Sequence, residues 1–241
     1  PVLTVHRARA DLAALLVRAS SRAPDAVAAN VDGASHELWV VSDEDAVATI
    51  GDAINSMDAI YIADGHHRSA AGCRVAERRR HNNPVHKGTE AYNGFLAISF
   101  PDDQVTILDY NRVVKGLDNF DAEAFKSALS ETYRIFPAPN PVRPESAGTF
   151  GMYLDGQWSL IKPIEPEEIE DPVEKLDVQL LSRSILSPLL GICDQRTDNR
   201  IDFVGGSRGP QEIARRVDSG EMQIGFTLYP TSLADLMDVA D

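Results

Sequence analysis

The stretch YIADGHHRSAAGCRVAERRR, residues 61–80, decides how this sequence is read. A short apolar run, residues 59–63, leads into it, and an apolar run of this length bounded by a turn predicts a buried strand. The alanine-rich part that follows predicts a helix that ends near Arg80. Only Asp64 and Gly65 lie between these two segments. The sequence therefore predicts a strand that passes directly into a helix.

The Asp-Gly-His-His-Arg motif (DGHHR) at this turn has the chemistry of a phosphate site. The start of a helix carries unpaired N–H groups and a partial positive charge, so it favours an anion. Gly65 allows a tight turn and the close approach of a ligand, and Arg68 can offer a bidentate fork to phosphate oxygens. His66 and His67 can donate hydrogen bonds or transfer protons in catalysis. Asp64 can cap the helix, bind a magnesium ion, or accept a proton from a substrate hydroxyl.

A purely structural role is also compatible with the same residues. In that interpretation Asp64 is an N-cap, the two histidines are exposed first-turn residues, and the arginines balance the acidic remainder of the chain. Arg68 argues for a ligand, because a cation at a helix N-terminus is unfavourable unless an anion is present. The arginines at residues 78–80 suit the opposite end of the helix and are typical of a solvated surface.

Composition limits the classes of protein that this chain can belong to. Its 241 residues are 43% hydrophobic, which is enough for a globular core. A formal net charge of −14 opposes non-specific binding of nucleic acid, so we expect no nucleic-acid partner and only a local anion site. No apolar run reaches the roughly 18 residues that cross a membrane, and no signal peptide is recognisable. We therefore expect a cytoplasmic protein with no membrane partner.

Cysteine and histidine spacing argues against a structural metal. Cys73 and Cys193 lie far apart in apolar surroundings, so we expect buried free thiols without a disulfide. Neighbouring residues on a helix point about 100° apart, so His66 and His67 are poorly placed to bind one ion together. We expect no zinc. The Walker glycine loop and the GxGxxG, GxSxG and CxxC motifs are also missing.

Strands and helices are mixed along the whole chain. The sequence predicts hairpins within residues 26–41 and around Asp155 and Gly156, and a helix opened by Ser42 or Asp43. It also predicts two strands, within residues 91–100 and 104–114, joined by the Pro-Asp-Asp turn. This pattern predicts an α+β (mixed α/β) fold.

One proline-rich segment, residues 137–147, has no periodicity and is the one credible boundary. It divides a phosphate- or nucleotide-binding part, residues 1–136, from a second α+β part, residues 148–241, and the two parts could also pack as one domain.

A second group of cations follows later in the chain. Arg196 and Arg200 precede a predicted strand that ends at Gly205 and Gly206, and these glycines permit close approach of a phosphate to the backbone. The alternative is that the glycines shape a turn while the arginines pair with neighbouring aspartates.

The end of another predicted strand carries two further cations, Arg112 and Lys115. Both are candidates for binding a cofactor phosphate, with ordinary surface charge as the alternative.

Several segments, in one order, resemble the signatures of the bacterial domain of unknown function 1015 family. The resemblance extends over residues 36–240 and is carried by LWVVSD, YIADGHHRSAA, NRVVKGL, GMYLDGQW, LLGICDQRTDNRIDFVGG and RRVDSGEMQIGFTLYPTS. Members of this family are usually longer at both ends. The resemblance therefore implies that the chain is a fragment of a longer protein.

The segment around residues 58–82 is also similar to the phosphate-binding turn of the ParB and sulfiredoxin superfamily, which includes nucleotide-dependent free-serine kinases. This local resemblance implies that residues 65–68 contact nucleotide phosphates and that Asp64 lies near the transferred group. It also implies ATP or ADP with magnesium as cofactor. We expect a phosphotransferase that acts on a small hydroxyl metabolite such as serine; the alternative is a non-catalytic module that senses a nucleotide or binds a partner.

Overall fold

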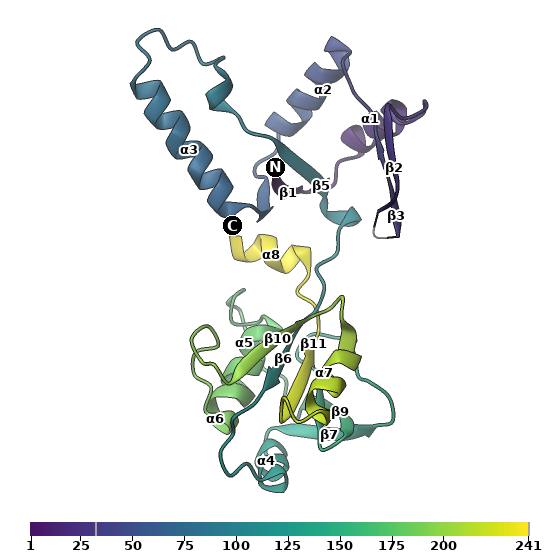
Figure 1. Ribbon diagram of the computed structural model, residues 1–241, viewed down its shortest axis with the longest axis vertical. Coiled ribbons are helices and arrows are strands. Elements are labelled where there is room, and N and C mark those ends of the chain that lie inside the picture. Colours follow the sequence, from purple (N-terminus) through teal and green to yellow (C-terminus); the bar gives the residue numbers. More distant parts are fainter. Residues whose placement is uncertain (32, 241) are drawn as a thin grey trace. The chain divides into compact units, whose positions relative to one another are not determined.

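The computed structural model describes residues 1–31 and 33–240 (Figure 1). It contains two compact units, Pro1–Val105 (unit 1) and Thr106–Asp241 (unit 2). Each unit combines helices with β-sheet, so the predicted α+β fold class is confirmed. The boundary lies at residues 105 and 106. The proline-rich segment 137–147, which we expected to separate two domains, lies inside unit 2 and places Val142 in its core.

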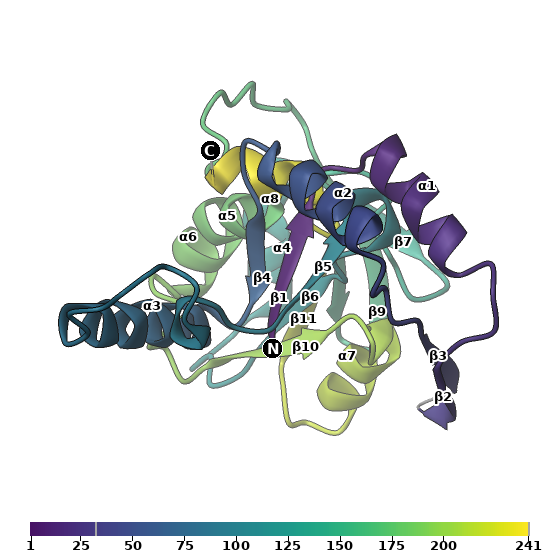
Figure 2. The ribbon, with the colours of Figure 1, turned by 90° about the horizontal axis from the view of Figure 1, so that it is seen from above.

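Unit 1 is built on a three-stranded sheet in the order β4-β1-β5 (Figure 2). Its central strand β1 (Val2–His6) pairs antiparallel with β4 (Tyr61–Asp64) and parallel with β5 (Ala97–Pro101). The sequence pattern predicts β4 but not β1, although β1 is the best-buried strand of the three. A segment of only five residues depends on its neighbours for burial, and these neighbours are distant in sequence.

The helices of unit 1 begin where local signals predict. Helix α1 buries Leu12 and Leu15, and α2 begins after Asp43, whose carboxylate accepts a hydrogen bond from the Ala46 N–H. The predicted hairpin is present as two exposed strands. The bounds of these elements are α1 Ala10–Ala19, β2 Ala26–Val31, β3 Ala34–Leu38, α2 Glu44–Asn55 and α3 His66–His81.

Unit 2 contains a six-stranded sheet in the order β10-β6-β11-β8-β9-β7, in which every neighbouring pair is antiparallel. The predicted hairpin at Asp155 and Gly156 is confirmed, and both residues have the positive φ that such a turn requires. The strands are β6 Tyr110–Val114, β7 Tyr133–Ala138, β8 Phe150–Leu154, β9 Gln157–Pro163, β10 Ile201–Gly205 and β11 Ile224–Leu228.

Two separate cores lie on the two faces of this sheet, and helices cover both of them (Figure 2). Helix α4 and the segment from α5 to α6 pack on one face, and α7 packs on the other. A π-helical turn, Ser182–Leu186, joins α5 and α6. The helices are α4 Ala122–Leu129, α5 Asp177–Leu181, α6 Ser187–Leu190, α7 Gly209–Asp218 and α8 Leu233–Ala240.

One expected connection is wrong. The sequence suggested that strands within residues 91–100 and 104–114 form neighbours joined by the Pro-Asp-Asp turn. The structure instead places β5 in the sheet of unit 1 and β6 in the sheet of unit 2. A turn signal shows that the chain changes direction, but it does not show which strand becomes the partner.

The contact between α7 and the sheet depends on Gly225, and this dependence can be tested. A Cβ at Gly225 would overlap the Cγ2 methyl of Ile213, which belongs to α7. We expect Gly225→Ala to lower the free energy of unfolding by about 1–3 kcal/mol, the range for overpacking. Urea denaturation measures this loss. A Cβ at Gly205, also on a strand of this sheet, meets no atom within 4 Å, so Gly205→Ala is the matched control. Equal stability of the two variants would contradict the prediction.

Candidate functional site

The predicted passage from strand to helix is present in unit 1. Strand β4 ends at Asp64, and α3 begins at His66. Gly65 joins them with φ 95°, in the left-handed region that other residues adopt only at a cost. A glycine is therefore required for this sharp change of direction.

The N-terminus of α3 is open. No side chain caps it, and its first turn carries no acidic residue. His66, His67 and Arg68 are all exposed, and the two imidazoles make no hydrogen bond to other residues that the structure describes. A helix start of this kind presents unpaired backbone N–H groups together with the positive end of the helix dipole. It can accept an anion without displacing a cap.

Arg68 is held at this turn by weak contacts. Its Nη2 donates to Asp64 Oδ2 at 2.7 Å, and its Nη1 donates to the carbonyl oxygen of Pro1. The guanidinium lies against Gly65, where an added Cβ would be 3.3 Å away. The side chains of Arg68 and Asp64 are 54% and 71% exposed, and a solvent-exposed ion pair contributes about 0–1 kcal/mol. Asp64 pairs with Arg68 and does not cap the helix, which differs from the purely structural interpretation, in which Asp64 is the N-cap.

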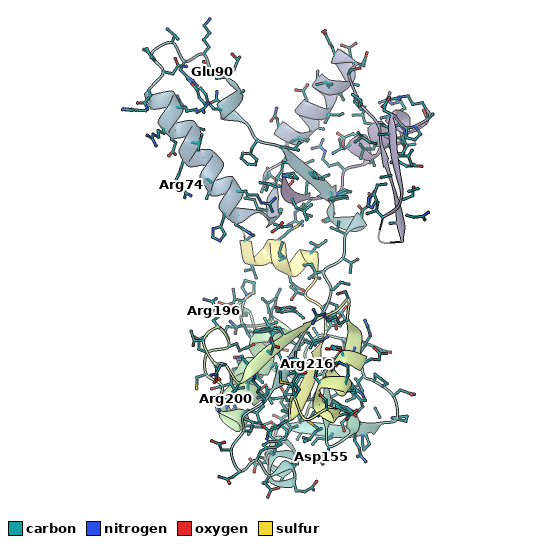
Figure 3. All side chains as sticks on the ribbon, in the orientation of Figure 1. Arg74, Glu90, Asp155, Arg196, Arg200 and Arg216 are labelled. Carbon is teal, nitrogen blue, oxygen red and sulfur yellow. The ribbon has the colours of Figure 1, made fainter. Side chains whose placement is uncertain are left out.

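The far end of α3 carries a basic groove. A hollow of about 500 Å³ is lined by Val75, Arg78, Arg79, Asn82, Asn83 and Tyr92. The segment after the helix is ordered around Glu90, whose carboxylate accepts bonds from the N–H groups of Lys87 and Gly88 (Figure 3). This groove lies at the opposite end of the helix from the DGHHR turn. The arginines near residue 80 are solvent-exposed, as the sequence indicated.

The second cation group belongs to unit 2, and part of it has structural partners. Arg200 donates to the Gly191 carbonyl at 2.7 Å and to the Asp198 carboxylate at 2.6 Å, so it closes the C-terminus of α6 (Figure 3). Gly206 permits close packing against Asp109, because a Cβ there would overlap the Asp109 carboxylate. These contacts explain both residues without a ligand.

The remaining candidates of the second group differ in burial. Lys115 and Arg196 are exposed, and Gly205 ends β10 with no atom within 4 Å of an added Cβ. Arg112 is buried, and its Nε donates to Gln195 Oε1 at 2.7 Å. Burial lowers the pKa of Arg112 to about 10. Gln195 lies on the loop between α6 and β10, and nothing in the local sequence pattern shows that this loop reaches β6.

Asp177 is a buried acid that nothing in the sequence pattern singles out. It opens α5, and its carboxylate accepts hydrogen bonds from the N–H groups of Gly148 at 2.8 Å and Tyr229 at 3.3 Å. Burial raises the pKa of Asp177 to about 6, although these two amides act in the opposite direction. Asp177 thus ties together three separate segments of unit 2.

Three further expectations concern cysteines, metals and membranes. Cys73 and Cys193 are free thiols, but both are exposed, so their expected burial is wrong. Cys73 lies on α3, which buries none of its residues. Over residues 1–31 and 33–240, no cluster of three His, Cys, Asp or Glu side chains is placed to hold a metal ion. No helix in the same described part of the chain is long and apolar enough to span a membrane.

The raised pKa of Asp177 predicts a pH dependence of stability. The folded state binds this proton more tightly than the unfolded chain, so its contribution is complete below pH 3.8 and is lost as the pH rises through about 6. We expect Asp177→Asn to remove a decline on the order of 2–3 kcal/mol over this window. Urea denaturation at a series of pH values measures it, with the exposed Glu168→Gln as control. An unchanged slope in Asp177→Asn would contradict the assignment.

Comparison with known proteins gives one structural neighbour of low similarity. A conserved hypothetical protein from Pyrococcus furiosus is 16% identical, with a TM-score of 0.38, and the match covers 78% of this chain. The chain spans 66% of the length of that protein. No curated protein matches the sequence.

A family match covers most of the chain. Residues 1–179 match the family described as protein of unknown function (DUF1015), and this range includes the DGHHR turn and Arg112. The expected family is thereby confirmed, and the chain belongs to the DUF1015 family.

Proposed function

We propose that the turn between β4 and α3 binds the phosphate groups of a nucleotide or of a small phosphorylated metabolite. The observation that carries this proposal is the open N-terminus of a 16-residue helix, with three exposed basic side chains in its first turn and no cap. Gly65 brings the backbone close to the position of an anion. The local resemblance to the ParB and sulfiredoxin superfamily supports the same assignment.

Binding of phosphate exchanges one anion for another at Arg68. The exposed pair with Asp64 contributes about 0–1 kcal/mol, whereas a charge-assisted bidentate bond to phosphate is worth about 1.5–3 kcal/mol. A phosphate therefore replaces Asp64 as the partner of Arg68. The released carboxylate becomes available beside the bound phosphates.

The released Asp64 suits a magnesium ion. Magnesium in nucleotide sites commonly binds one or two carboxylates together with phosphate oxygens and water, and Asp64 is an exposed carboxylate in this position. When bound, the ion would neutralise charge on the phosphates. Gly65 and Arg68 would hold the phosphates, and Asp64 or one of the histidines, His66 or His67, would take the proton of the acceptor hydroxyl.

The reaction that fits these residues is transfer of a phosphoryl group to a small hydroxyl metabolite. Serine as that metabolite rests on the resemblances of the sequence alone. The second candidate is a non-catalytic module that senses a nucleotide, because a phosphate cradle by itself performs no chemistry. The exposure of every side chain in the turn favours this second candidate, since catalytic sites usually exclude water.

Binding is tested with Mg·ATP and inorganic phosphate by isothermal titration calorimetry. We expect Arg68→Ala to weaken binding by about 1.5–3 kcal/mol while the thermal midpoint changes little. Arg74→Ala is the matched control, because Arg74 is an exposed arginine farther along the same helix (Figure 3). A large fall in the midpoint of Arg68→Ala with unchanged affinity would show that Arg68 only stabilises the fold.

Turnover separates the two candidate functions. Phosphorus NMR of the protein with Mg·ATP, with and without serine, follows ADP and any phosphorylated product. A phosphotransferase would form ADP together with phosphoserine, and Asp64→Asn would abolish this reaction. Binding of ATP without formation of ADP would instead identify the sensing module.

A further inference from the structure

Unit 2 contains two buried arginines that differ in one respect. Arg216 is 7% exposed and pairs with the carboxylates of Asp202 and Glu221, each at 2.6 Å (Figure 3). Arg112 is 6% exposed, and no carboxylate of the described residues lies within ion-pair distance of it. Buried charges are normally paired because leaving water is costly. Arg112 therefore requires an explanation that Arg216 does not.

Only neutral groups hold the Arg112 guanidinium in place. Its Nε donates to Gln195 Oε1 at 2.7 Å, and its Nη1 donates to the backbone carbonyl of Tyr110. The guanidinium carbon lies 5.3 Å from the centre of the Tyr110 ring and 4.8 Å from that of Phe203. These contacts orient the cation, but none of them supplies a negative charge. With a pKa of about 10, the guanidinium is still charged at neutral pH.

One edge of the guanidinium stays accessible. Nη2 donates to no atom of the described residues. No fully buried side-chain nitrogen or oxygen among these residues lacks a partner, so Nη2 must retain contact with solvent. Nη2 is therefore the part of the guanidinium that is open to a ligand, and its neighbour Nη1 has a second N–H besides the one given to Tyr110. Two such N–H groups side by side make the fork that matches a planar oxyanion.

We propose that Arg112 anchors a binding site for a small molecule that carries a carboxylate group on a flat, unsaturated or aromatic body. A single guanidinium without a second cation balances one negative charge, which suits a carboxylate better than a phosphate dianion. The rings of Tyr110 and Phe203 are stacked 5.1 Å apart with 7° between their planes, and Tyr110 is 53% exposed. They offer an apolar surface beside the cation, on neighbouring strands β6 and β10 (Figure 1).

The identity of residue 195 supports this assignment. An acid at this position would reach Arg112 Nε at the present 2.7 Å and would neutralise it within the chain. Glutamine keeps the same hydrogen bond and leaves the charge free. Gln195 therefore orients Arg112 without neutralising it, whereas in a structural ion pair an acid at this position would supply the counter-charge.

Benzoate is the probe for this site, because it combines a carboxylate with a flat ring. Saturation-transfer NMR titrations should give saturable binding to the wild-type chain with Kd on the order of 1 mM, as expected for a small fragment. Benzamide, which has the same shape without the charge, should not bind. Arg112→Lys should weaken benzoate binding by about tenfold or more, since lysine keeps the charge but loses the fork.

Gln195→Glu separates the effect on binding from the effect on stability. We expect the introduced carboxylate to occupy Arg112, so that the thermal midpoint is kept or raised while benzoate binding falls by about tenfold or more. Arg134→Ala is the control, because Arg134 is an exposed arginine on β7, at the other edge of the same sheet, and this variant should bind benzoate like the wild type.

Three results would overturn the proposal. The first is that benzoate does not bind the wild-type chain, and the second is that Gln195→Glu and Arg112→Lys bind it unchanged. The third is that inorganic phosphate binds the wild-type chain, displaces benzoate and loses its affinity in Arg112→Lys, which would assign the site to phosphate. None of these results depends on the DGHHR turn, which lies in unit 1.

Discussion

Burial of both faces of strand β6 is the constraint on which unit 2 depends. Val113 and Val114 are neighbours in sequence, point to opposite sides of the sheet, and are both fully buried. Each belongs to a different core, so a shift of one residue in register would exchange the two cores. A polar residue on this strand can be kept only if its hydrogen bonds are met locally. Asn111 satisfies this condition, since its carboxamide donates to Asp109 and accepts from the N–H of Leu228, whereas Arg112 keeps one nitrogen, Nη2, in contact with solvent.

Unit 1 follows a different principle, since its longest helix contributes no buried residue. Helix α3 is attached to the sheet through Gly65, and Phe95 contacts it at Gly72. The passage through Gly65 keeps the first turn of this helix in a defined place, while most of the helix surface stays in water. This arrangement suits a site made from backbone N–H groups, because their direction depends on the helix start and not on side-chain packing.

Local signals in the sequence predicted those features that depend on neighbouring residues. A helix start at Ser42 or Asp43, the turn at Asp155 and the strand-to-helix passage at Gly65 were all recognisable, because each depends on the conformational preference of one or two residues. The structure places the cap at Asp43. Strands β1 and β7 were missed. Strand β1 is buried by partners that lie far along the chain, and β7 contains Pro137, the start of the proline-rich segment that indicated a loop.

The candidate site residues show the same division. The exposed DGHHR side chains have the surroundings that their sequence indicated. Two groups that contact Arg112, Phe203 and Gln195, could not be foreseen, because they lie on another strand and on a loop. Arg200 is the clearest case, since its partners are mainly a backbone carbonyl and a nearby aspartate. A sequence motif does not show whether an arginine will bond to a ligand or to a carbonyl of its own chain.

The contacts of Arg200 also affect the loop between α6 and β10. Arg200 stands at the end of this loop and bonds to the carbonyl of Gly191 at its beginning, which closes residues 191–200 into a ring. Gln195 lies in the middle of that ring. A closed loop has few conformations, so the entropy loss of ordering Gln195 occurs when the protein folds. The carboxamide is therefore already positioned against Arg112 before any ligand arrives, and binding there does not have to order the loop.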